Sequence, residues 1–173
     1  NNVVIGHDAF AASINDGDKN VAIGAGAMKT GDVSGDGNIA VGELTLEDLT
    51  TGTDNIAIGS GAGLQVTDNV DNIAIGHGSG AMKTGDVSGA DNIGIGSLAL
   101  EDLTTGASNV AIGKSAALNL TTGALNIAIG QSAIGSGITT GGKNVAIGYH
   151  AATALTSGEG NTVLGVGALT SAT

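Results

Sequence analysis

The 173-residue chain contains no cysteine, no proline and no arginine, and its only aromatic residues are Phe10 and Tyr149. Without cysteine it can form neither a disulfide bond nor a thiolate metal site. The absence of proline and of a strict Gly-X-Y period excludes a collagen-like fibre. The 16 acidic residues outnumber the five lysines, and the formal net charge is −11. Because nucleic acids and anionic membranes are bound by basic surfaces, we expect neither as a partner.

What the chain has in abundance is one short phrase, Asn-Val/Ile-Ala-Ile-Gly, and its close variants. A fixed short period of this kind is typical of stacked, quasi-one-dimensional proteins. We therefore expect one all-β domain over residues 1–173, a parallel β-solenoid of about ten coils of 17–18 residues. Both ends fall inside a repeat, which suggests a fragment of a longer fibre. The phrases begin at Asn2, Asn20, Asn38, Asn55, Asn72, Asn92, Asn109, Asn126, Asn144 and Asn161.

The residues after each asparagine, which is counted as position 0, predict a short strand. Positions +1 and +3 are almost always Val, Ile or Leu, and alternation places both on one face. Recurrent glycine and β-branched residues argue against a helix. We expect positions +1 and +3 to fill the coil as a core ladder that includes Val21, Ile23, Ile56, Ile58, Ile73, Ile75, Val110 and Ile112.

Position +2 is alanine in most repeats, and alternation places it on the opposite face of the strand. If that face were exposed, an unbroken apolar stripe in water would favour association with other copies. The sequence therefore predicts a homo-oligomer that packs through Ala22, Ala40, Ala57, Ala74, Ala111, Ala128 and Ala146.

The rest of each repeat carries small and large apolar residues at positions +7 and +8, and several repeats close on a Thr-Thr-Gly or Thr-Ser-Gly turn. This pattern predicts a second short strand after the glycine corner. Stacking in register would place asparagine above asparagine, so that the amides hydrogen-bond along the rod.

The phrase Asn-Val-Ala-Ile-Gly, followed by x-x-Ala and a later glycine turn, resembles the YadA-like head repeat of trimeric autotransporter adhesins over essentially the whole chain. It is also similar to repeats of phage tail fibres, whose version the Thr-Thr-Gly turn favours. The resemblance implies a left-handed parallel β-roll, a trimer and a surface that binds host matrix or cells. The period of 17–18 residues is longer than the adhesin head repeat, and no neck, stalk or anchor is present.

No catalytic, cofactor-binding or metal-binding residues are expected. Asp16-Gly-Asp18 begins like a calcium loop, but Val21 and Ala27 stand where that loop requires glycine and glutamate. Residues 137–143 approach a P-loop without the helix that a phosphate cradle needs. His7, His77 and His150 are four coils apart, which is too far for a shared metal ion.

Taken together, these features favour a rigid rod or receptor-binding head of a phage tail fibre or a bacterial surface adhesin. We expect it to be extracellular, on a cell surface or virion, and not an enzyme. Possible partners besides itself are a cell-surface receptor or a glycan. An ice- or glycan-binding solenoid is the alternative, and a polysaccharide depolymerase is less favoured because adjacent carboxylates such as Glu47 and Asp48 point to opposite faces of a strand. The uncharged run 115–142 keeps the repeat and its polar residues, so we expect no membrane insertion.

Overall fold

Ten three-residue strands, one per repeat, form the fold in a computed structural model that describes residues 1–11, 16–30, 32–63, 66–77, 81–82, 87–135 and 140–170. Each strand covers positions +1 to +3 of its repeat. They are β1 (Val3–Ile5), β2 (Val21–Ile23), β3 (Ile39–Val41), β4 (Ile56–Ile58), β5 (Ile73–Ile75), β6 (Ile93–Ile95), β7 (Val110–Ile112), β8 (Ile127–Ile129), β9 (Val145–Ile147) and β10 (Thr162–Leu164).

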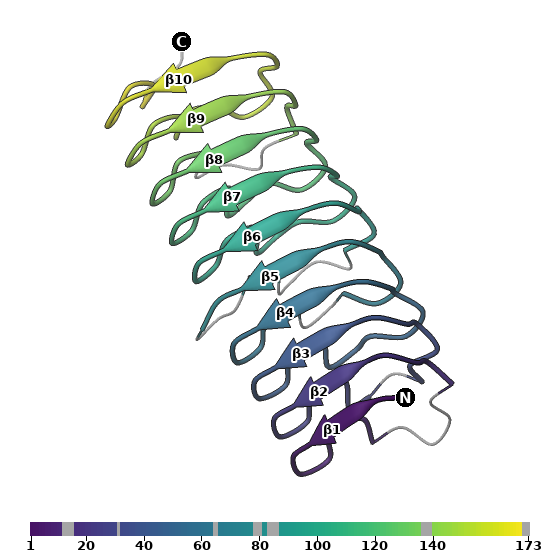
Figure 1. The fold of residues 1–173 in the computed structure, drawn as a ribbon. Coiled ribbons are helices and arrows are strands. Elements are labelled where there is room, and N and C mark those ends of the chain that lie inside the picture. Colours follow the sequence, from purple (N-terminus) through teal and green to yellow (C-terminus); the bar gives the residue numbers. More distant parts are fainter. Residues whose placement is uncertain are drawn as a thin grey trace.

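The strands form a single parallel sheet in sequence order, from β1 to β10. The chain winds from each strand to the next, so the strands lie one above another along a rod and the two termini lie at opposite ends (Figure 1). The register keeps equivalent positions together, as in Val21 opposite Ile39 and Ala22 opposite Ala40. No helix occurs within the described ranges. The expected parallel β-solenoid and its like-on-like stacking are confirmed.

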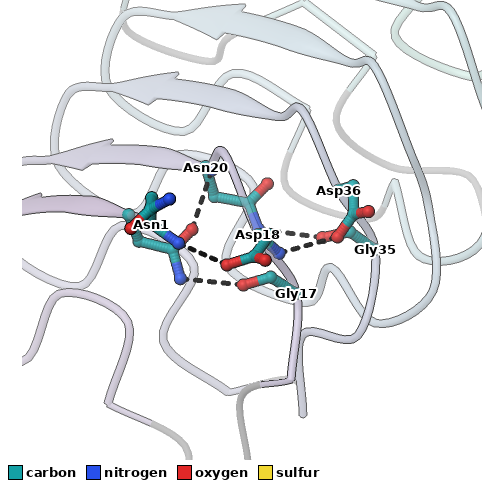
Figure 2. A network of polar contacts seen from close by, with 7 residues as sticks. Asn1, Gly17, Asp18, Asn20, Gly35 and Asp36 are labelled. Carbon is teal, nitrogen blue, oxygen red and sulfur yellow. Dashed lines mark hydrogen bonds and ion pairs between the residues drawn. The ribbon is translucent and has the colours of Figure 1, made fainter.

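The repeated asparagine is buried and links each coil to its neighbours. The backbone N–H of Asn126 donates to Oδ1 of Asn109 at 2.9 Å, and Nδ2 of Asn126 donates to the same oxygen at 3.1 Å. Nδ2 also donates across the coil to the carbonyl oxygen of Gly141 at 3.0 Å. Figure 2 shows the start of this ladder, where Asn20 donates to Gly35. From Asn20 to Asn144 each asparagine of the ladder closes its own coil and bonds to the adjacent one, as the repeat predicts.

The junction between the coils of β4 and β5 contains a second buried amide. Position −3 is glycine in the neighbouring coils, but Asn69 stands there with its side chain 5% exposed. Its Nδ2 donates to the carbonyl oxygen of Gly89 at 3.1 Å, whereas its Oδ1 is buried without a hydrogen-bond partner. The Gly89 oxygen also receives Nδ2 of Asn72 and of Asn92. An unpaired buried acceptor is costly, so we expect it to weaken this junction.

The expected core ladder and inter-chain stripe are both wrong, because the two faces of the strand are exchanged. The alanines are buried inside a single chain, with exposed fractions of 0 to 2%, so they cannot form a contact between chains: Ala22, Ala40, Ala57, Ala74, Ala111, Ala128 and Ala146. The residues predicted to fill the coil point outward and are half-buried or exposed: Val21, Ile23, Ile56, Ile58, Ile73, Ile75, Val110 and Ile112.

The reason for this exchange is the narrow interior of the coil. Gly94 takes position +2 in β6, and a Cβ there would lie 3.2 Å from the backbone oxygen of Ala99 and 3.3 Å from Cε of Met82. A methyl group already fits tightly, so a branched side chain would not fit. The larger buried side chains come from the far side of the coil, as Met28, Leu46, Leu49, Leu100, Leu103 and Leu120.

The corner after each strand requires glycine. Gly24, at position +4, has φ of +136°, and a Cβ there would lie 2.2 Å from the carbonyl oxygen of Gly42 in the next coil. An L-residue at this position would meet both backbone strain and a steric clash.

The expected second strand is replaced by turns. Positions +6 and +8 repeatedly adopt left-handed backbone even where the residue is not glycine, as in Leu44 (φ 51°) and Leu46 (φ 49°). Such residues cannot continue an extended strand. In the described part of this segment only two isolated bridges occur, Val66 with Val87 and Ile134 with Ala152.

Candidate functional site

The outward side chains of all ten strands form one continuous apolar surface, which we call the Val/Ile face. It consists of positions +1 and +3 of every strand, and Thr162 is its single polar residue. Its side chains stay accessible on strands that have a neighbour on each side, where Ile58 is 40%, Ile112 is 38% and Ile147 is 37% exposed. With ~4.8 Å between coils and ~3.3 Å per residue, the face measures roughly 45 Å by 10 Å.

An uncovered apolar surface of this length is unusual. Isolated exposed apolar residues are common, but contiguous patches of several hundred Å² on soluble proteins mark interaction sites. The face is flat and regular because every side chain on it is stacked on its equivalent in the next coil. A face that is flat, long and apolar can pack closely against another face that is also flat, long and apolar.

Two columns of exposed or half-buried residues border this face. Before the strands, at position −1, lie Asn1, Lys19, Gly37, Asp54, Asp71, Asp91, Ser108, Leu125, Lys143 and Gly160. After the corner, at position +5, lie His7, Ala25, Glu43, Ser60, His77, Ser97, Lys114, Gln131, Tyr149 and Val166. Both borders thus carry charges of each sign at fixed heights along the rod.

The acidic turns at the start of the rod form local contacts. The backbone N–H of Asp18 donates to Oδ1 of Asp36 at 2.6 Å, as Figure 2 shows. Among the described residues no three His, Cys, Asp or Glu side chains gather as a metal site would require.

The histidines lie at the surface in separate places. His7 lies 3.4 Å from Asp8 through Nδ1, and Asp8 also lies 3.6 Å from Nζ of Lys29. His150 packs edge-on against the ring of Tyr149, with ring centroids 4.2 Å apart. Of the P-loop-like segment 137–143, residues 137–139 lie outside the described residues.

A shallow hollow of about 240 Å³ lies beside the turns that precede β8, β9 and β10. Its lining combines two hydroxyl groups, one ammonium group, one carboxylate and a short apolar floor. The lining residues are Thr122, Ala124, Leu125, Thr140, Gly142, Lys143 and Glu159.

Sequence reasoning missed the Val/Ile face because it assigned these residues to the interior. One signal could have found it. Alternation places position 0 and position +2 on the same side of the chain. A ladder of stacked asparagines that bond within the coil therefore requires the alanines to point inward with them.

The class of protein that these features define is a parallel β-solenoid of the β-roll repeat type, with an apolar face that the described residues leave uncovered. Comparison with protein-family models, with curated proteins and with solved structures gave no match to this chain. None of the described residues forms a helix long and apolar enough to cross a membrane.

Proposed function

We propose that this chain is a non-enzymatic, self-associating segment of an extracellular fibre, a rigid rod or receptor-binding head of a phage tail fibre or bacterial surface adhesin. The observation that carries the proposal is the Val/Ile face, which runs along all ten strands and which no described residue of the chain covers. The resemblance to YadA-like head repeats supports the same reading and implies three copies.

The flat part of the contact is the face itself, roughly 45 Å by 10 Å, or about 450 Å². The chain turns on both sides of it, at left-handed residues such as Lys19 and Asp54 before the strand and at the glycine corner after it. A standard stable interface buries about 800 Å² on each side, so the contact must also include the side chains of the two borders. A partner for this face should be flat and apolar and should repeat with the same spacing. The Val/Ile face of a second copy of the chain has all three properties.

The proposal predicts that charge on the Val/Ile face separates the copies without unfolding them. The triple variant Ile58→Lys, Ile127→Lys and Ile147→Lys places ammonium groups at three exposed face positions. Sedimentation should show an oligomer for the unaltered chain and a monomer for the variant, because burying an unpaired charge opposes association. Far-UV circular dichroism should stay β-type.

A matched control carries the same added charge elsewhere. Thr51→Lys, Val70→Lys and Thr122→Lys change exposed positions away from the face and should leave the oligomer intact. An unaltered chain that sediments as a monomer, or a face variant that stays as oligomeric as its control, would contradict the proposal.

Glycan binding is the second candidate function, and the turn surface favours it. Exposed hydroxyl residues occupy position −4 in five successive coils, as Ser88, Thr105, Thr122, Thr140 and Ser157, and Thr51 lies beyond an interruption at Asp68. These residues border the hollow that Lys143 and Glu159 also line. Hydroxyl, ammonium and carboxylate groups around a small apolar floor can bond the hydroxyls of a sugar ring.

The double variant Thr122→Val and Thr140→Val should lose binding to a glycan array at least tenfold if this hollow holds a sugar, since each valine keeps the shape of threonine and removes its hydroxyl group. The same change at Thr51 and Thr105 is the control. Equal binding by all three proteins would exclude the hollow.

A further inference from the structure

We infer that the hollow beside the turns that precede β8, β9 and β10 binds a zwitterionic sugar, one that carries both an amino group and a carboxylate. This inference rests on glycan binding as the second candidate function and names the chemical class of the glycan. It follows from two opposite charges, Lys143 and Glu159, which line the same hollow and do not pair with each other.

The backbone that frames the hollow is held by hydrogen bonds between successive turns. The N–H of Lys143 donates to the carbonyl oxygen of Ala124 at 2.9 Å, and that of Gly160 donates to Gly142 at 3.1 Å. A Cβ at Gly142 would lie 2.8 Å from the same Ala124 oxygen. The middle turn therefore has no room for a side chain at position −2, where the turns on either side carry Ala124 and Glu159. A site framed by such a backbone needs little ordering when it binds a ligand.

Lys143 and Glu159 present opposite charges to this frame. They belong to successive turns, one coil height or ~4.8 Å apart along the rod, and both residues are exposed. The ion pairs that the described residues form with one another include neither of them. The ammonium and the carboxylate can therefore each accept a counter-ion from a ligand that lies between them.

These two groups dominate the electrostatics of the hollow. From residue 103 to the end of the sequence the charged side chains are those of Lys114, Lys143 and Glu159, and Lys114 lies on the other border of the Val/Ile face. The remaining acidic residues lie between Asp8 and Asp102. A Debye length of about 8 Å at physiological ionic strength screens exposed charges that are several coils away. The charge of the ligand is thus selected by the local pair and not by the net charge of the chain.

Ligands of four charge types can be compared at this pair. An anionic sugar would pair with Lys143 but would be repelled by Glu159, and a cationic sugar would meet the reverse. A neutral sugar would displace water from both charges and supply a counter-ion to neither. A zwitterion supplies a counter-ion to each, which is the complementarity that favours one ligand over its analogues.

The rest of the lining fits the remainder of a sugar residue. Thr122 and Thr140 offer hydroxyl groups from successive turns, and Ala124 and Leu125 offer apolar surface to the C–H groups of the ring. The volume of about 240 Å³ lies below the roughly 300 Å³ at which pockets for drug-sized ligands begin. One sugar residue therefore fits better than an oligosaccharide.

Four sugars of the same glucosamine type test the inference. Muramic acid carries an amine and a carboxylate, N-acetylmuramic acid only the carboxylate, glucosamine only the amine, and N-acetylglucosamine neither. Saturation-transfer NMR with the unaltered chain gives their dissociation constants. An exposed ion pair changes an affinity by up to about fivefold. Muramic acid should bind at least about threefold more tightly than the two singly charged sugars, and at least about tenfold more tightly than N-acetylglucosamine.

Two single variants assign the charges. Lys143→Gln should weaken the binding of both sugars that carry a carboxylate and should not weaken that of glucosamine. Glu159→Gln should weaken the binding of both sugars that carry an amine and should not weaken that of N-acetylmuramic acid. Lys114→Gln and Glu43→Gln are the matched controls, because these exposed residues lie outside the hollow, and they should change no affinity.

The possible failures are distinguishable. If N-acetylglucosamine bound as tightly as muramic acid, and Thr122→Val with Thr140→Val removed both, the charge class would be wrong and glycan binding at the hollow would stand. If Lys143→Gln changed no more than Lys114→Gln, the pairing of Lys143 with a carboxylate would be overturned. If none of the four sugars bound, the inference would fall together with the second candidate function, whereas self-association is decided separately by sedimentation.

Discussion

Replacing Ala111 with isoleucine is expected to lower the free energy of unfolding by about 3 kcal/mol, the upper end of the usual range for overpacking. Ala111 is 0% exposed in the centre of β7, and the equivalent position in β6 already lies 3.2 Å from a backbone oxygen. The side chain cannot turn outward, because alternation fixes its face, so the coil must open. Chemical denaturation followed by circular dichroism measures the loss.

The neighbouring change Ile112→Ala is the control for this prediction. Ile112 is 38% exposed, and its truncation should cost less than about 1 kcal/mol, since little packing is lost. Both changes are best compared in the monomeric triple-lysine background, where association cannot contribute. A larger loss for Ile112→Ala than for Ala111→Ile would mean that the isoleucines form the core after all.

Replacing Asn109 with alanine is expected to cost about 4 kcal/mol. Its Nδ2 donates to Asn92 Oδ1 at 3.0 Å and to the Gly123 oxygen at 2.9 Å. Its own Oδ1 accepts from the backbone N–H and the Nδ2 of Asn126. The substitution leaves at least that N–H and the Gly123 carbonyl buried without partners, and each such group costs about 1–3 kcal/mol. The denaturation midpoint should fall accordingly.

Asn69→Ala is the control for this prediction, because it also removes the amide side chain of a buried asparagine. Here the substitution removes an Oδ1 that has no partner, and the carbonyl oxygen of Gly89 keeps two other donors. The free energy of unfolding should stay within about 1 kcal/mol of the original value or rise slightly. If both substitutions lowered the free energy of unfolding equally, the hydrogen bonds of the ladder would not account for the loss at Asn109.

The coil, its period and its asparagine ladder could be predicted from the sequence, because they depend on repetition and on β-branched residues in alternation. The side of the strand that faces inward could not be predicted from alternation alone. Alternation sorts Ala111 and Ile112 into two sets but does not say which set is enclosed. The predicted asparagine ladder supplies the missing information, because position 0 shares a face with position +2. The physical reason for the choice is the narrow width of the coil, which Met28, Leu46 and Leu49 fill from the far side.

The turns that follow the strands could not be predicted from the sequence either. Leu44 and Leu46 hold left-handed backbone, a conformation that leucine seldom adopts on its own and that stacking on adjacent coils imposes here. In the fourth coil Gly61 and Gly63 stand at the same two positions. Glycine adopts left-handed backbone without strain because it has no Cβ. A comparison of equivalent positions across coils therefore carries information that no single repeat contains.

The asparagine bonds run along the axis of the rod, and this has a mechanical consequence. A fibre pulled at its two ends loads its coil junctions in series, so the same force acts on each of them. The tensile strength of such a stack is that of its weakest junction rather than the average of all of them. Because the amide oxygen of Asn69 is left unbonded, we expect the described part of the rod to yield first between the coils of β4 and β5.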